Sequence, residues 1–384
     1  MTVSALTRPG QRDRISEKLG EIDWRLAALL AFVAGVGGMM LYSIAGGHWA
    51  PWASAQLTRF FLLFGVMIVL SLIDLKVWYS LSYPIYIVAL VLLVATAAVG
   101  QTHLGGKRWL GVGHFTIQPS EIMKIGLVMA LGRFYHSLTA KQARWSWKLL
   151  IPAAMIGAPV LLVAKQPDLG TAIMLAVTGG VMMFMAGLTW KVLVAGFVTV
   201  SAAAVPVYMF LLKGFQKSRI DVFLHPDRDP SGKGYHVIQA AIAAGSGGLL
   251  GKGYMLGSQS QLNYLPEKQT DFIFATVAEE FGFVGCFILL LAYGMIVAAG
   301  LRIASTSHSH FGRMAAAGVT AAFGFYVLIN GAMVIGLAPV VGVPMPLMSY
   351  GGTVMVTVMV GMGLVQAVRV HRYSELPRGR GFLF

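Results

Sequence analysis

Residues 272–300 read FIFATVAEEFGFVGCFILLLAYGMIVAAG, an apolar run whose only charged residues are Glu279 and Glu280. At a rise of about 1.5 Å per residue, a helix of this length crosses the ~30 Å hydrocarbon core of a bilayer. Nine similar apolar runs lie at residues 24–44, 54–73, 78–99, 120–136, 148–164, 170–188, 192–212, 313–337 and 346–370. The sequence therefore predicts an all-α fold, a polytopic membrane bundle of about ten transmembrane helices.

The composition of the chain supports the same class. The 384 residues are 57% hydrophobic and 11% charged, whereas a soluble domain carries about 25% charged residues. In a soluble protein the net charge of +14 would suggest nucleic acid. In a membrane protein it is explained by basic cytoplasmic loops, so no nucleic-acid partner is expected. We expect a multi-pass protein of the cytoplasmic, or inner, membrane.

The short basic loops predict the orientation of the bundle. An even number of spans places both termini on one side, and their Arg and Lys residues assign that side to the cytoplasm. The expected units are an arm at residues 1–23, one transmembrane domain at 24–372, and a tail at 373–384. A large extracytoplasmic loop, residues 213–271, separates spans seven and eight. Within it, residues 235–244 predict a short interfacial or re-entrant helix.

Charged residues in or near the membrane are costly and often functional. Glu121 and Lys124 share one helix face at i,i+3 spacing, as a structural ion pair or as functional groups. Asp271 is either a general base at the membrane boundary or an N-cap, and Glu279 lies near the same face, deeper in the helix. Asp168 has the same two interpretations, with the cap favoured.

The long loop also contains a cluster of glycines beside basic residues. Glycine lets the backbone approach a bulky group, and Lys252 and Arg219 lie near in sequence, so an anion such as pyrophosphate is a reasonable ligand. The alternative is a flexible loop. The cluster consists of Gly245, Gly247, Gly248, Gly251, Gly253 and Gly257.

Five stretches of sequence carry a resemblance to a known family. They are Arg108-Trp109 with Gln118-Pro-Ser-Glu121; Gln166-Pro-Asp-Leu-Gly170; Asp229-Pro-Ser-Gly-Lys-Gly-Tyr235; Gly245-Ser-Gly-Gly248 through Gly251-Lys-Gly253 and Leu265-Pro-Glu267 to Thr270-Asp-Phe-Ile-Phe274; and Gly336-Leu-Ala-Pro339 through Pro346 to Ser349-Tyr-Gly-Gly352. In this order they make the chain resemble the SEDS family of cell-wall polymerases. The resemblance runs from about Trp24 to Arg372 and is closer to the RodA branch than to FtsW.

The resemblance implies an enzyme that polymerises lipid II outside the cytoplasmic membrane, with inversion at the anomeric carbon. The catalytic acid of the family matches Asp271, and its paired Glu and Lys match Glu121 and Lys124. Arg219 also matches a family position. Residues expected to bind substrate or pyrophosphate, or to support the site, are Arg219, Lys252, Glu121, Lys124, Lys268, Arg108, Glu279 and Ser349.

The same resemblance implies partners. These are a class B penicillin-binding protein, which is the transpeptidase, and membrane proteins of the elongation complex. A divalent cation, Mg or Mn, is a possible cofactor. One departure is Gln269, which stands where the family often has His. Three alternatives stay open: a flippase or transporter for the lipid-linked precursor, a division-specific polymerase of the FtsW type, and a non-catalytic scaffold.

Overall fold

The computed structural model describes residues 15–103, 106–112, 115–138, 147–206, 217, 221–223, 225, 233–262, 264–265 and 267–377. Helices occupy all ten positions where spans are predicted. They are α2 Trp24–Ile44, α3 Ala53–Ser71, α4 Leu75–Val99, α5 Pro119–His136, α7 Leu150–Lys165, α8 Leu169–Met185, α9 Trp190–Pro206, α13 Ile273–Thr306, α14 His310–Val334 and α15 Gly352–Val370. The predicted end of the seventh span, residues 207–212, lies outside the described residues.

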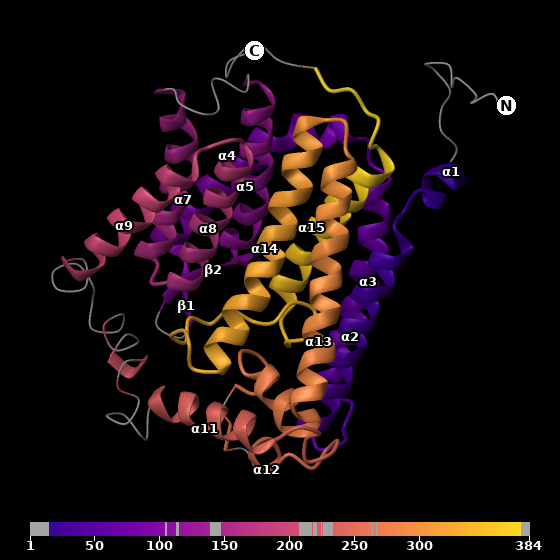
Figure 1. Cartoon of the computed structure of the whole chain (residues 1–384), viewed down its shortest axis with the longest axis vertical. Helices are drawn as coiled ribbons and strands as arrows, with labels where there is room; N and C mark the ends of the chain where they lie inside the picture. The colour runs from indigo at the N-terminus through magenta and orange to yellow at the C-terminus, as the bar shows by residue number, and fades with distance from the viewer. Residues whose placement is uncertain are drawn as a thin grey trace.

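By length and composition, six of these helices are able to cross a membrane: α2, α3, α4, α13, α14 and α15. The helices form a bundle with α14 at its centre (Figure 1). On one side α14 packs on α13 and α15, which lie beside α2 and α3, and on the other side it packs on α5 and α8, which contact α4 and α7. The predicted polytopic helix bundle is confirmed.

The segments between the helices hold shorter elements. Residues 101–117 form a three-stranded antiparallel sheet of β1 Gln101–His103, β2 Gly106–Val112 and β3 Phe115–Ile117. This sheet was not predicted from the sequence, because two of its three strands have only three residues and leave almost no periodic signal. The remaining short helices are α1 Ile15–Gly20, η1 Trp147–Leu149, α11 Lys233–Ser246 and α12 Ser258–Gln261. The helix predicted at residues 235–244 is therefore confirmed as α11, which lies across one end of the bundle (Figure 1).

Small residues let the long helices approach closely. A Cβ added at Gly37 of α2 would lie 2.7 Å from the Cα of Met348, in the segment before α15. On α15 itself, a Cβ at Gly363 would lie 2.9 Å from the Cβ of Leu70 of α3. These contacts explain the Gly-rich spans, since packing between helices in lipid relies on close van der Waals contact.

The two ends of the described chain meet at the end of the bundle opposite α11. The side-chain amide of Gln366 on α15 donates to the Asp23 carbonyl and accepts from the Asp23 amide, at 3.0 Å each. Arg372 forms an ion pair with Glu21. The two described ends of the chain therefore lie at the same end of the bundle.

Candidate active site

Segments that are far apart in sequence converge near Asp271, at the α11 end of the bundle. A Cβ at Gly170 would lie 2.7 Å from the carbonyl oxygen of Val341, so the turn at residues 166–170 packs on the segment before α15. In that segment, a Cβ at Gly342 would lie 3.7 Å from Oδ2 of Asp271. Four of the five family stretches contribute described residues near this end, while residues 229–232 of the other stretch lie outside the described part of the chain.

Asp271 is partly exposed and is held through its backbone. Asn330 of α14 donates one hydrogen bond from Nδ2 to the Asp271 carbonyl and another to the Val343 carbonyl, both at 2.8 Å. The N-cap position of α13 belongs to Phe272. Asp271 therefore lies at the end of the bundle, in the turn that precedes α13.

The turn before Asp271 is also fixed to its surroundings. The amide of Tyr350 donates to the Gln269 carbonyl at 2.8 Å. Lys268 is buried and donates to the carbonyl of Ser260, and burial lowers the pKa of its ammonium group. A hollow beside Lys268 is bordered by Gln261 and by the α2–α3 connection, including His48. This hollow is therefore lined by polar side chains, including Lys268, which precedes Asp271 by three residues in the sequence.

Glu279 and Lys252 pair with each other. Their side chains are 2.7 Å apart, and the Glu279 side chain is fully buried. Glu279 also accepts hydrogen bonds from the amides of Gln259 at 2.8 Å and Ser260 at 3.2 Å. Glu280 turns the other way and accepts from Ser43 of α2. In this structure Glu279 holds the loop that leads to Lys268, and its charge is balanced by Lys252.

The glycine cluster packs against a break in α13. Gly282 has φ +64°, and the helix on either side of it is bridged by residues 247–253. The amides of Lys252 and Gly253 donate to the carbonyls of Glu279 and Glu280, both at 3.0 Å. A Cβ at Gly247 would lie 1.8 Å from the carbonyl oxygen of Ala278.

These contacts give the glycines a role that differs from both sequence-based interpretations. The bulky group that the backbone approaches is the backbone of α13 itself. The amides of Lys252 and Gly253 donate to carbonyls of α13 that are freed by the break, so these backbone groups are satisfied within the protein.

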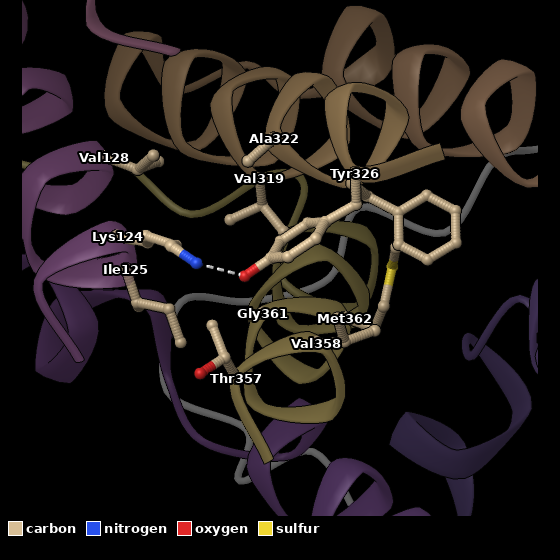
Figure 2. A pocket seen from close by; sticks show the side chains of 11 residues that line it. Lys124, Ile125, Val128, Val319, Ala322, Tyr326, Thr357, Val358, Gly361 and Met362 are labelled. Carbon is tan, nitrogen blue, oxygen red and sulfur yellow. Dashed lines mark hydrogen bonds between the residues drawn. The ribbon is translucent and has the colours of Figure 1, made fainter. Parts of the chain in front are cut away.

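The pair predicted from i,i+3 spacing in α5 is present. Nζ of Lys124 lies 2.7 Å from Oε1 of Glu121, and both side chains are buried. Tyr326 of α14 donates to Glu121 at 3.0 Å and accepts from Lys124. Figure 2 shows Lys124 directed at the Tyr326 hydroxyl, above Thr357 and Gly361 of α15. The sequence did not reveal Tyr326, because one tyrosine in an apolar helix has no distinctive pattern.

Three other predicted residues hold loops in place. Arg108 of β2 donates to the Pro167 carbonyl and lies 3.9 Å from the Asp168 carboxylate. Asp168 caps α8 by accepting from the Thr171 amide at 3.3 Å, which confirms the favoured cap interpretation. Ser349 is buried, and its hydroxyl accepts from the Met345 amide at 2.8 Å.

Arg59 of α3 is a basic residue near this site that the sequence analysis missed. Its guanidinium lies 5.0 Å from the centre of the Tyr350 ring and donates to the Tyr350 hydroxyl at 3.3 Å. An arginine within an apolar span was the available signal. Arg219 lies outside the described residues. Among the residues described, no group of three His, Cys, Asp or Glu side chains could hold a metal ion, and the divalent cation stays a prediction.

The fold and the site together define a multi-pass membrane protein with a carboxylate-centred polar site at one end of its helix bundle. Residues 22–374 match the family model of FtsW, RodA and SpoVE, described as cell cycle proteins. The chain therefore belongs to this family, the SEDS family that its motifs resemble.

Relatives with known names agree with this assignment. The chain is 42% identical over 307 residues to the peptidoglycan glycosyltransferase MrdB of Escherichia coli K12, covering 80% of this chain and 82% of that protein. It is 33% identical to stage V sporulation protein E of Bacillus subtilis, covering 92% and 98%.

Solved structures agree as well. A chain from a peptidoglycan synthase complex, described as coordinating polymerization and crosslinking, has a TM-score of 0.78 and 32% identity, covering 92% of this chain and 99% of its own. The rod shape determining protein RodA of Thermus thermophilus has a TM-score of 0.69 and 27% identity, covering 92% and 98%.

Proposed function

We propose that this chain is a peptidoglycan glycosyltransferase that polymerises lipid II into glycan strands. The single observation that carries the proposal is the convergence of the family stretches around Asp271, in a chain 42% identical to a peptidoglycan glycosyltransferase. Lipid II is a disaccharide-peptide joined to a polyprenol by pyrophosphate. Its polyprenol lies in the membrane, which suits a site at the end of a membrane-spanning bundle.

In this proposal Asp271 is the general base. Its carboxylate takes the proton of an acceptor sugar hydroxyl as the oxygen forms a bond to the donor's anomeric carbon. The bond from that carbon to the pyrophosphate oxygen breaks, and its electron pair leaves with polyprenyl pyrophosphate. One displacement at carbon inverts its configuration. The leaving group is already a stable anion, so a second carboxylate acting as an acid is less needed than in glycosidases.

Developing charge on the pyrophosphate requires a cation. Lys252 is neutralised by Glu279, whereas Arg59 donates its hydrogen bond to the neutral hydroxyl of Tyr350. We therefore assign Arg59 to the pyrophosphate. Lys268, which lies three residues before Asp271, and Arg219, the family residue, are assigned beside it. Lys252, Glu279, Arg108 and Ser349 support the loops. A divalent cation would act beside these groups.

The biological setting is part of the proposal. Higher identity to MrdB than to FtsW proteins, which are 33–35% identical, favours elongation over division. We place Asp271 on the extracytoplasmic side and both termini in the cytoplasm. The chain would work with a class B penicillin-binding protein and other elongation proteins, and its match to a chain of a peptidoglycan synthase complex supports such a partner.

The test is polymerisation of lipid II by the purified protein with its transpeptidase partner. Asp271→Asn and Asp271→Ala are compared with Asp74→Asn, which alters a carboxylate that caps α4 away from the site. Loss of glycan in both Asp271 variants, with unchanged unfolding and an active Asp74 variant, is the expected result. Normal glycan from the Asp271 variants would refute the base assignment. Lipid II crossing vesicles at a rate indifferent to Asp271, without glycan formation, would instead favour a flippase.

A further inference from the structure

The end of the bundle opposite Asp271 contains a basic hollow that the proposed reaction does not use. It lies between the start of α2 and the ends of α13 and α15, and its lining includes Arg25, Arg302 and Arg369, one from each helix. Trp24 and Asp23 also border it. Among the described residues that line this hollow, three are arginines and one, Asp23, carries a carboxylate.

The charges of this hollow are not balanced within the described chain. Among the described residues, none of the three guanidinium groups has an ion pair with a carboxylate, and Nε of Arg369 is buried without a hydrogen-bond partner. The one carboxylate, Asp23, is engaged in capping α2 and accepts from the amides of Arg25 and Leu26 at 3.1 Å. The hollow is therefore suited to an anion.

The position of the hollow indicates which anion. Arg25 lies in the first turn of α2, Arg369 in the last turn of α15, and Arg302 four residues before the end of α13. All three therefore lie near the helix ends, where spanning helices leave the hydrocarbon. Trp24 is 52% exposed and Leu301 is 45% exposed beside them. Exposed Trp is typical of the membrane interface. A ligand here would meet guanidinium groups at its head and apolar helix surface along its tail.

We propose that this hollow binds the phosphodiester headgroup of an anionic phospholipid, with its acyl chains along α13. Arginine presents a fork of N–H donors that matches phosphate oxygens, and basic pockets between transmembrane helices bind such headgroups. A bound headgroup would join the ends of three helices at the side opposite Asp271. The inference does not depend on the proposed enzymatic reaction, because none of its residues lies near Asp271.

The experiment measures lipid binding to the purified full-length protein in a non-ionic detergent by native mass spectrometry. The probes are dioleoylphosphatidylglycerol and, as a zwitterionic reference, dioleoylphosphatidylcholine. The variants are Arg302→Gln, the triple variant Arg25→Gln/Arg302→Gln/Arg369→Gln, and the control Arg313→Gln. Arg313 lies in the first turn of α14, at the same end of the bundle, and is not among the residues that line the hollow, so the control removes one equal charge.

We expect wild type and Arg313→Gln to retain phosphatidylglycerol preferentially. Arg302→Gln should weaken that binding about tenfold, as expected for loss of one charge-assisted contact. The triple variant should show no preference between the two lipids. Phosphatidylglycerol should also raise the thermal unfolding temperature of wild type but not of the triple variant, which tests the site even where binding counts are low.

Two outcomes would overturn the proposal. The first is equal retention of phosphatidylglycerol by wild type and the triple variant, with both folded. The second is binding of glycerophosphoglycerol, the headgroup without chains, as tightly as phosphatidylglycerol, which would show that the acyl chains contribute nothing and would identify a site for a soluble anion. A triple variant that fails to fold is replaced by Arg302→Gln/Arg369→Gln, judged by the same comparison with Arg313→Gln.

Discussion

Two neighbouring glycines should respond to alanine with opposite signs. Gly247 lies where residues 247–253 cross the break in α13, and a Cβ there would be 1.8 Å from the carbonyl oxygen of Ala278. A carbon–oxygen contact needs about 3.3 Å, so the loop must retreat by roughly 1.5 Å. Gly245 lies two residues earlier, within α11, and a Cβ there would meet nothing within 4 Å.

The loss of stability expected for Gly247→Ala follows from the close contact of this residue and from the hydrogen bonds that its loop forms across the break in α13. Overpacking typically costs about 1–3 kcal/mol, and each backbone hydrogen bond across the break contributes about 1 kcal/mol. Two of those bonds join Lys252 and Gly253 to α13 at 3.0 Å. We expect Gly247→Ala to lower the free energy of unfolding by about 2–4 kcal/mol. Gly245→Ala should raise it by about 0.5–1 kcal/mol, because alanine favours a helix.

The assay is thermal unfolding of both purified variants in one detergent, followed by glycan formation from lipid II. Gly247→Ala should also make less glycan, since the displaced loop continues to Ser260 and hence to Lys268. Equal unfolding temperatures for the two variants would refute the account of the loop. So would a Gly247 variant as stable as wild type, because the clash is with backbone and no side chain can move to relieve it.

Three further changes test other contacts of the site. Lys252→Met should destabilise the fold by about 3–5 kcal/mol because it leaves the buried Glu279 carboxylate without its cation, and denaturant unfolding should show most of this loss restored by adding Glu279→Gln. Tyr326→Phe should cost about 1–3 kcal/mol by removing two hydrogen bonds from the buried Glu–Lys pair of α5, and an unchanged unfolding midpoint would contradict that network. Asn330→Ala removes the hydrogen bond to the Asp271 carbonyl, so the rate of glycan formation at saturating lipid II should fall. Asn330→Asp has a similar shape but no N–H donor, so its rate should be as low as that of the alanine variant.

The helices could be predicted closely because lipid imposes a simple rule on sequence. Every spanning segment must be apolar and satisfy its own backbone hydrogen bonds, so each run of apolar residues marks a helix. The predicted first span matches α2 at both ends, and the α15 prediction errs at its start, where residues 346–351 form an irregular segment. The break at Gly282 was not predicted. The carbonyls freed by this break accept hydrogen bonds from amides about thirty positions earlier in the chain. Contacts over such a separation leave no signal in the local hydrophobic periodicity.

The acidic residues of the candidate site could be predicted from the sequence, but most of the residues that contact them could not. Spacing alone placed Glu121 beside Lys124, because i,i+3 neighbours share a helix face. The pairing of Lys252 with Glu279 depends on a loop folding back on a broken helix, and spacing carries no trace of it. Asn330 is equally hidden, since its two acceptors are the carbonyls of distant segments.

The pairing of charges changes which residues the proposed chemistry can use. A cation already neutralised by a buried carboxylate adds little field at a substrate, and displacing it would leave that carboxylate buried and unpaired. Lys252 is in this position, as its partner Glu279 is fully buried. Arg59 differs, because its contacts with Tyr350 are to a neutral ring and hydroxyl, so its full charge stays available beside the segment that is bonded to Gln269. In the proposed reaction the glycine-rich loop therefore fixes the turn that carries Asp271, and Arg59 of α3 offers its charge to the pyrophosphate.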